Sequence, residues 1–112
     1  MSATDLRFHM INLLRTIASP EKQTAYQKNV PIANVANEIV CQWFDDFHPN
    51  SELFRQAFLE EEIKLLEQFT RVFDKQVDKL PDNLEALLAS AEWEFIMSKA
   101  RVTLEAAGWK EN

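Results

Sequence analysis

The sequence predicts an all-α fold, an irregular bundle of four to five helices that ends in a long antiparallel helical hairpin. Apolar residues recur at spacings of three and four along most of the chain, as on one face of a helix. The 112 residues include a single glycine, too few for the tight turns that connect strands. Hydrophobic residues make up 46% and charged residues 27%, which is typical of a globular domain. We therefore expect residues 1–112 to form one helical domain.

Two helices are predicted in the first 30 residues. The first spans about residues 3–18, and either Ser2 with Asp5 three positions later, as a capping box, or Thr4 can cap its first turn. Its apolar face is formed by Leu6, Met10, Leu13, Leu14 and Ile17. Ser19 followed by Pro20 matches the preferred residues at the start of a helix. A second, short helix should therefore run to about residue 28, before Pro31 interrupts the chain.

The next predicted helix, residues 31–47, is apolar over most of its circumference. Its polar residues are confined to a narrow stripe made of Asn34, Asn37, Glu38, Gln42, Asp45 and Asp46. A helix of this kind is buried on several sides, so we expect it to be the central helix. The loop at 48–51 contains Pro49, and either Asn50 or Ser51 should cap the following helix.

The predicted hairpin occupies the rest of the chain. Residues 51–79 contain no glycine or proline and would form one helix of about 42 Å. A heptad-like apolar seam runs along it through Leu59, Ile63, Leu66, Thr70, Phe73, Val77 and Leu80. After a short connector the last helix should continue to about residue 107, with Phe95 on its apolar side. Gly108 is placed as the left-handed residue that ends it, and Trp109 would fold back on the last turn.

The charge distribution restricts the class of partner. The formal net charge is −6, and residues 51–112, with eight basic and thirteen acidic side chains, account for −5 of it. An acidic surface repels nucleic-acid phosphates and anionic membranes, so binding to either is not expected. A basic partner would be attracted instead. With no signal-like N-terminus, no apolar run long enough to span a membrane and one cysteine, the expected location is cytoplasmic.

The residues that usually carry chemistry are few and scattered. His9 and His48 are far apart and form none of the spacings of zinc or di-iron ligands. Cys41 lies inside a predicted helix with no neighbouring base to activate it, which favours a half-buried structural thiol. A single glycine near the C-terminus excludes phosphate-binding loops and serine nucleophile elbows. We therefore predict that the protein is not an enzyme and needs no metal or cofactor.

The function we expect is that of a non-enzymatic protein-binding module. In its most concrete form it is an acidic inhibitor that masks a basic toxin or nuclease. The partner-binding residues predicted from charge and position are Asp45, Asp46, Glu60, Glu61, Glu92, Trp93 and Glu94. Trp93 fits either an anchor exposed between two carboxylates or a core residue. In general character the chain is similar to several bacterial immunity and antitoxin proteins, a likeness of class that no motif carries.

Two alternatives follow from the apolar residues. The wide stripe on residues 51–80 could form the seam of a helical homo-oligomer, with a homodimer as its simplest form. The second alternative is a helical bundle that binds a small ligand. Its pocket would lie between helices and be lined by Trp43, Phe47, Phe54, Phe58 and Phe95.

Overall fold

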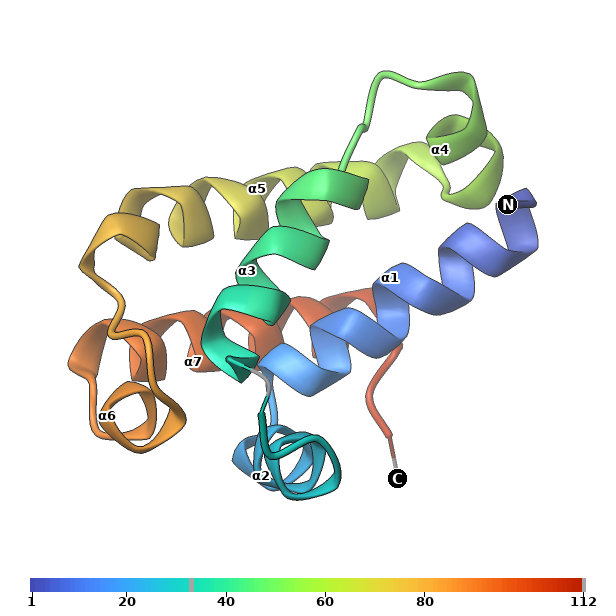
Figure 1. Cartoon of the computed structure of the whole chain (residues 1–112). Helices are drawn as coiled ribbons and strands as arrows, with labels where there is room; N and C mark the ends of the chain where they lie inside the picture. The colour runs from blue at the N-terminus through green and yellow to red at the C-terminus, as the bar shows by residue number, and fades with distance from the viewer. Residues whose placement is uncertain (33, 112) are drawn as a thin grey trace.

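The structure, a computed structural model, describes residues 1–32 and 34–111, and within them the fold is all-α (Figure 1). Seven α-helices and one 3-10 turn account for the regular structure of this part of the chain, which contains no strand. The elements are α1 (Ala3–Ile17), α2 (Pro20–Asn29), α3 (Val35–Asp46), α4 (Glu52–Ala57), α5 (Glu60–Gln76), the 3-10 turn (Val77–Lys79), α6 (Leu84–Leu88) and α7 (Ala91–Ala107). The predicted fold class is therefore confirmed, although the helices are shorter and more numerous than expected.

The longest helices, α5 and α7, pack against each other and run in opposite directions (Figure 1). Helix α1 packs on α4 and α7, while α3 crosses the bundle and contacts both α1 and α6. The interior is dominated by large side chains with almost no exposed surface: Trp43, Trp93, Phe54, Phe69, Phe73, Met10, Leu14, Ile17, Leu66, Leu87, Ile96 and Met97. This aromatic core holds the ends of α3, α4 and α5 in fixed positions.

Local signals at the helix ends are confirmed. The Ser2 hydroxyl accepts from the Asp5 amide at 3.1 Å, and the Asp5 carboxylate accepts from the Ser2 amide at 3.4 Å, which completes the capping box. Ser19 caps α2, with Pro20 at its first position. Gly108 takes the left-handed conformation, with φ at 77°. The Trp109 amide then donates back to the Leu104 carbonyl at 2.8 Å.

The prediction of one helix over residues 51–79 is wrong. The backbone is extended at Phe58 and Leu59, so α4 ends and α5 begins after a sharp corner. No glycine or proline causes this break. Two side chains stabilise the free backbone groups at this corner. Arg7 of α1 donates to the Ala57 carbonyl at 3.0 Å, and Glu62 of α5 accepts from the Leu59 amide at 2.8 Å. Leu59 is exposed as a result, instead of beginning the expected apolar seam.

The last helix is also interrupted, at Ala89 and Ser90. Ser90 caps α7 by accepting from the Trp93 amide at 3.1 Å. The new start sets the phase of the helix, so its buried face is formed by Trp93, Ile96, Met97, Ala100, Thr103 and Leu104. Phe95, expected on the apolar side, is 55% exposed. The prediction for Phe95 is therefore wrong.

Helix α3 is shorter than predicted and is not enclosed on all sides. It begins at Val35, where the Asn34 side chain accepts from the Asn37 amide at 3.1 Å. Ile32, included in the predicted apolar surface, lies before the helix and is 98% exposed. Trp43 on the opposite side is fully buried and makes an edge contact with Phe69 of α5, with ring centroids 5.1 Å apart. The helix thus closes one side of the core and presents its polar stripe to solvent.

Substituting Ser90 tests whether this residue sets the start of α7. We expect Ser90→Ala to lower the free energy of unfolding by about 1 kcal/mol, because the Trp93 amide loses its acceptor at the helix start. Urea denaturation followed by circular dichroism would measure it. Ser98→Ala, an exposed change within the same helix, should stay within about 0.5 kcal/mol of the wild type. Equal stability of the two variants would contradict a capping role.

Candidate functional site

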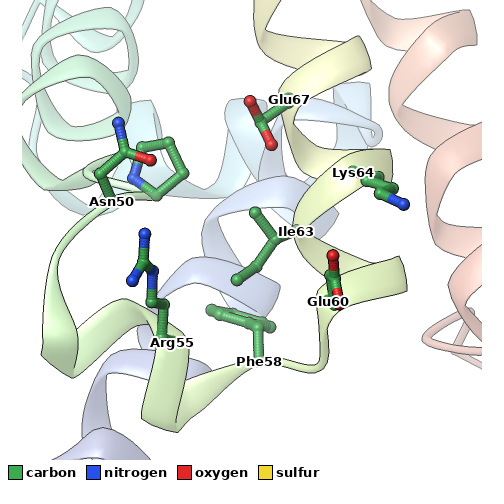
Figure 2. Close-up of a pocket in the computed structure, with 8 residues that line it drawn as sticks. Asn50, Arg55, Phe58, Glu60, Ile63, Lys64 and Glu67 are labelled. Carbon is green, nitrogen blue, oxygen red and sulfur yellow. The ribbon is translucent and has the colours of Figure 1, made fainter.

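A half-open cleft of about 450 Å³ lies between the loop before α4 and the first half of α5 (Figure 2). Figure 2 shows Asn50 and Arg55 on one side of it, Glu60, Lys64 and Glu67 of α5 on the other, and Phe58 with Ile63 between them. The cleft therefore combines an apolar floor with charged groups of both signs on its rim.

The loop side of the cleft is held by hydrogen bonds around Ser51. Its amide and hydroxyl both donate to the His48 carbonyl, at 3.0 and 2.8 Å. The same hydroxyl accepts from the Phe54 amide at 3.1 Å and so caps α4. Pro49, whose φ is restricted, lies within this turn and lines the cleft. The wall is consequently formed by an ordered turn and a capped helix.

The floor of the cleft is held in place by Arg7, which lies near the N-terminus of the chain. The Arg7 guanidinium donates two hydrogen bonds to the Glu62 carboxylate, at 2.8 and 3.0 Å. The same group lies over the rings of Phe58 and Trp109, 5.3 and 5.6 Å from their centroids. The hydrogen bond from Arg7, reinforced by the Leu59 amide, lowers the pKa of Glu62. These contacts hold Phe58 under the cleft.

Charged residues of alternating sign follow the cleft along α5. They occur at spacings of four and three and therefore share one side of the helix: Glu60, Lys64, Glu67, Arg71 and Asp74. The spacing of Glu60 and Lys64 predicts an ordinary i,i+4 pair, but the described residues form only four ion pairs within 4.0 Å, and none includes these five side chains. Their charges are open to a partner.

A second, shallower depression of about 190 Å³ lies next to the cleft and shares Glu67 with it. Phe44 and Phe47 from the end of α3 line one side, and Thr70, Arg71 and Asp74 of α5 line the other. Phe47 packs against Phe54 with ring centroids 5.3 Å apart. The cleft and the depression together follow four turns of α5, from residue 60 to residue 74.

The structure brings only part of the predicted acidic set near this cleft. Glu60 lines it directly, and Glu61 is exposed beside it. Asp45 is exposed at the end of α3, where the chain enters the loop. Asp46 is turned toward α1, where its carboxylate lies 2.6 Å from the His9 ring nitrogen Nε2. Asp46 is therefore less available to a partner than its neighbour.

The other predicted residues do not belong to this site. Glu92 and Glu94 lie in the first turn of α7, at the opposite end of the α5–α7 pair from Glu60 (Figure 1). Trp93 is fully buried, and its indole N–H donates to the Gln23 side chain at 3.0 Å. The interpretation of Trp93 as an exposed anchor is therefore wrong, because it is a core residue. The seven predicted residues do not form one patch.

The aromatic pocket proposed for a small ligand is not formed as predicted. Four of the five rings make consecutive contacts, with centroids 5.8, 5.3 and 5.0 Å apart along the series Trp43, Phe47, Phe54 and Phe58. Phe95 does not face them, since it lies on the outer side of α7. Packed rings leave no room for a ligand between them.

Sequence reasoning missed Arg55, Lys64 and Glu67 as site residues and assigned Phe58 to a different, aromatic pocket. The expected uninterrupted helix would not have brought α4 and α5 together as two sides of a cleft. The corner depends on Arg7, 50 residues before Ala57, and no local pattern points to that contact. Only the alternating charges of α5 were visible in the sequence.

Neither a metal site nor a membrane span emerges from the described residues. Within 1–32 and 34–111, no three His, Cys, Asp or Glu side chains are grouped to hold a metal ion. Cys41 is exposed, in contrast to the expected half-buried thiol. In the same residues no helix combines the length and the apolar character needed to cross a membrane.

Comparison of the chain with protein families, curated proteins and solved structures finds no match.

Proposed function

We propose that the protein is a non-enzymatic protein-binding module and that its cleft beside α5 receives a basic partner protein. The observation that carries the proposal is the combination of an aromatic floor with unpaired charges on one open surface. Protein interfaces typically have an apolar centre surrounded by a polar rim. Phe58 and Ile63 would supply the centre, and the α5 charges would supply the rim.

The preference for a basic partner rests on the charges beside the cleft. The charged residues that line the cleft and the depression balance, with Arg55, Lys64 and Arg71 opposing Glu60, Glu67 and Asp74. Exposed carboxylates adjoin these linings, because Glu61 follows Glu60, Glu52 lies one turn before Arg55, and Asp45 follows Phe44. With the exposed Lys75 beside Asp74 counted, the surface still has a net negative charge. Such a surface accelerates encounter with a basic protein. Masking of a basic toxin or nuclease remains the most concrete form of this function.

A charge-reversal pair of variants tests the proposal. We expect Glu60→Lys with Glu61→Lys to reduce capture of basic host proteins by at least about tenfold. Two negative charges at the rim of the cleft become positive, so the rim repels a basic protein instead of attracting it. Asp78→Lys with Asp82→Lys changes the net charge equally at two exposed positions beyond the C-terminal end of α5 and should leave capture nearly unchanged. Quantitative mass spectrometry of proteins captured from a native host extract would compare the wild type with both variants.

Salt dependence provides the second measurement. Capture by the wild type should fall steeply between low and high salt, because exposed charges are screened beyond roughly 10 Å at 0.1 M. If both double variants lose the same proteins, the interaction follows overall charge and the cleft is not the site. If wild type and variants capture the same proteins at every salt concentration, the proposed function is wrong.

A further inference from the structure

Helix α7 carries an apolar stripe on its outer side. Its residues are spaced four, three, four and four positions apart, and all are exposed: Ala91, Phe95, Ser98, Val102 and Ala106. Phe95 and Val102 are 55% and 54% exposed. The opposite face of α7 is in the core through Trp93, Ile96 and Met97, so the helix is already held in place. The stripe thus resembles one half of a helix–helix seam.

Charged residues flank this stripe in a regular order. Glu92 and Lys99 lie along one flank, and Glu94 and Arg101 lie along the other, and the members of each pair are seven positions apart. Each pair therefore places a carboxylate toward the N-terminal end of α7 and a cation toward its C-terminal end, and the flank with Glu94 and Arg101 ends in a further exposed carboxylate, Glu105. Within one copy, Arg101 lies 3.6 Å from Glu94 and donates to the Ala18 carbonyl at 3.1 Å, and the Glu94 and Arg101 side chains are 63% and 47% exposed.

We propose that this stripe binds the same stripe of a second copy of the chain, in an antiparallel pair with its two-fold axis near residues 96 and 97. In an antiparallel pair related by a two-fold axis, each flank faces the same flank of the other copy in reverse direction. Glu92 then faces Lys99 of the second copy. Glu94 faces its Arg101, so four pairs of opposite charge form across the seam.

The apolar residues match in size at the same alignment. Phe95 of one copy lies opposite Ser98 of the other, and Val102 lies opposite Ala91, so each large side chain meets a small one. A parallel pair would instead bring Glu92 beside Glu94 of the second copy and Lys99 beside its Arg101, where like charges repel. Charge and size therefore select the same antiparallel arrangement.

The length of α7 limits how strong this association can be. Its 17 residues span about 25 Å, so one helix pair buries less than the roughly 1,200 Å² of a standard stable interface. The dimer should accordingly be weak and reversible. The stripe shares no residue with the cleft beside α5, so this inference does not depend on the proposed function.

Sedimentation equilibrium over a concentration series measures the association directly. The apparent mass of the wild type should rise from 13.0 kDa toward twice that value. Phe95→Ser should raise the dissociation constant by at least about tenfold, because it removes the largest side chain of the seam. Phe8→Ser is the matched control, since Phe8 is an exposed phenylalanine on α1, and this variant should associate like the wild type.

Two charge variants test the alignment itself. Lys99→Glu makes one flank wholly negative, and Glu92→Lys makes it wholly positive, so each variant alone should remain monomeric. An equimolar mixture should form a heterodimer at least as stable as the wild-type dimer, because the facing charges are opposite again. The proposal is overturned if the wild type stays monomeric at millimolar concentration, if Phe8→Ser weakens association as much as Phe95→Ser, or if the mixture associates no better than its components. Circular dichroism would establish that each variant is folded.

Discussion

Trp93→Ala is expected to lower the free energy of unfolding by about 4 kcal/mol, since it empties the centre of the core. The indole has no exposed surface and contacts the ring of Phe73, with centroids 6.1 Å apart. Its N–H also donates to the buried Gln23 carbonyl oxygen at 3.0 Å. Alanine would leave both a cavity and an unpaired polar atom, and each destabilises the fold. Urea denaturation monitored by circular dichroism would measure the change.

Trp93→Phe separates the polar part of this effect from the cavity. It keeps most of the ring and removes the N–H, so we expect a loss of about 1 to 2 kcal/mol. Phe8→Ala is the control for removing an aromatic ring, because Phe8 is 66% exposed, and its effect should be about 0.5 kcal/mol or less. A loss in Trp93→Ala as small as in this control would show that residue 93 is not in the core.

The buried position of Trp93 could not be read from its neighbours. Glu92 and Glu94 on both sides suggest exposure, yet successive helical residues point about 100° apart, and a buried residue can lie between two solvated ones. Which direction faces inward depends on where the helix begins. The last helix was predicted to run without a break from the connector to about residue 107, whereas Ser90 begins a separate helix. The missed break placed Phe95 on the core side and left Trp93 undecided between core and surface, whereas Trp93 is buried and Phe95 is exposed.

The predictions that rested on local signals in the sequence are confirmed. Ser2 with Asp5, Ser19 with Pro20, and Gly108 with Trp109 each act within a few residues, and all three are found where they were predicted. Apolar spacing likewise identified the core face of α1. These features depend on backbone groups adjacent in the chain, so no knowledge of the tertiary structure was needed.

The corner between α4 and α5 illustrates the opposite case. Residues 51–79 have good helix propensity throughout, and propensity is overridden where tertiary contacts stabilise another conformation. The residues that stabilise this corner include Arg7 and Trp109, which come from near the two ends of the chain. The cleft could not be predicted because its geometry depends on contacts with these two residues.

Arg7→Met should lower the free energy of unfolding by about 2 to 3 kcal/mol and loosen the cleft. Methionine keeps the apolar stem but removes the two hydrogen bonds to Glu62, the one to the Ala57 carbonyl, and the contacts with two rings. It also leaves the Glu62 carboxylate, only 12% exposed, without its cation. The loss in free energy of unfolding is moderate because the Arg7 side chain is 37% exposed, and solvent screens its charge. Arg71→Met, which breaks no ion pair within 4.0 Å, should cost about 0.5 kcal/mol or less.

The dependence on pH distinguishes this ion pair from simple packing. The pKa of Glu62 in the folded protein lies below its ordinary value of 4.5, because Arg7 donates hydrogen bonds to the charged form. The stability that this shift supplies is complete above the unfolded pKa and is lost as the pH falls through the folded pKa. The difference in unfolding free energy between wild type and Arg7→Met should therefore narrow from pH 7 to about pH 3. Because the other carboxylates titrate in both proteins, their contributions cancel in this difference. A constant difference across that range would assign the effect of Arg7 to its packing on Phe58 and Trp109 and not to Glu62.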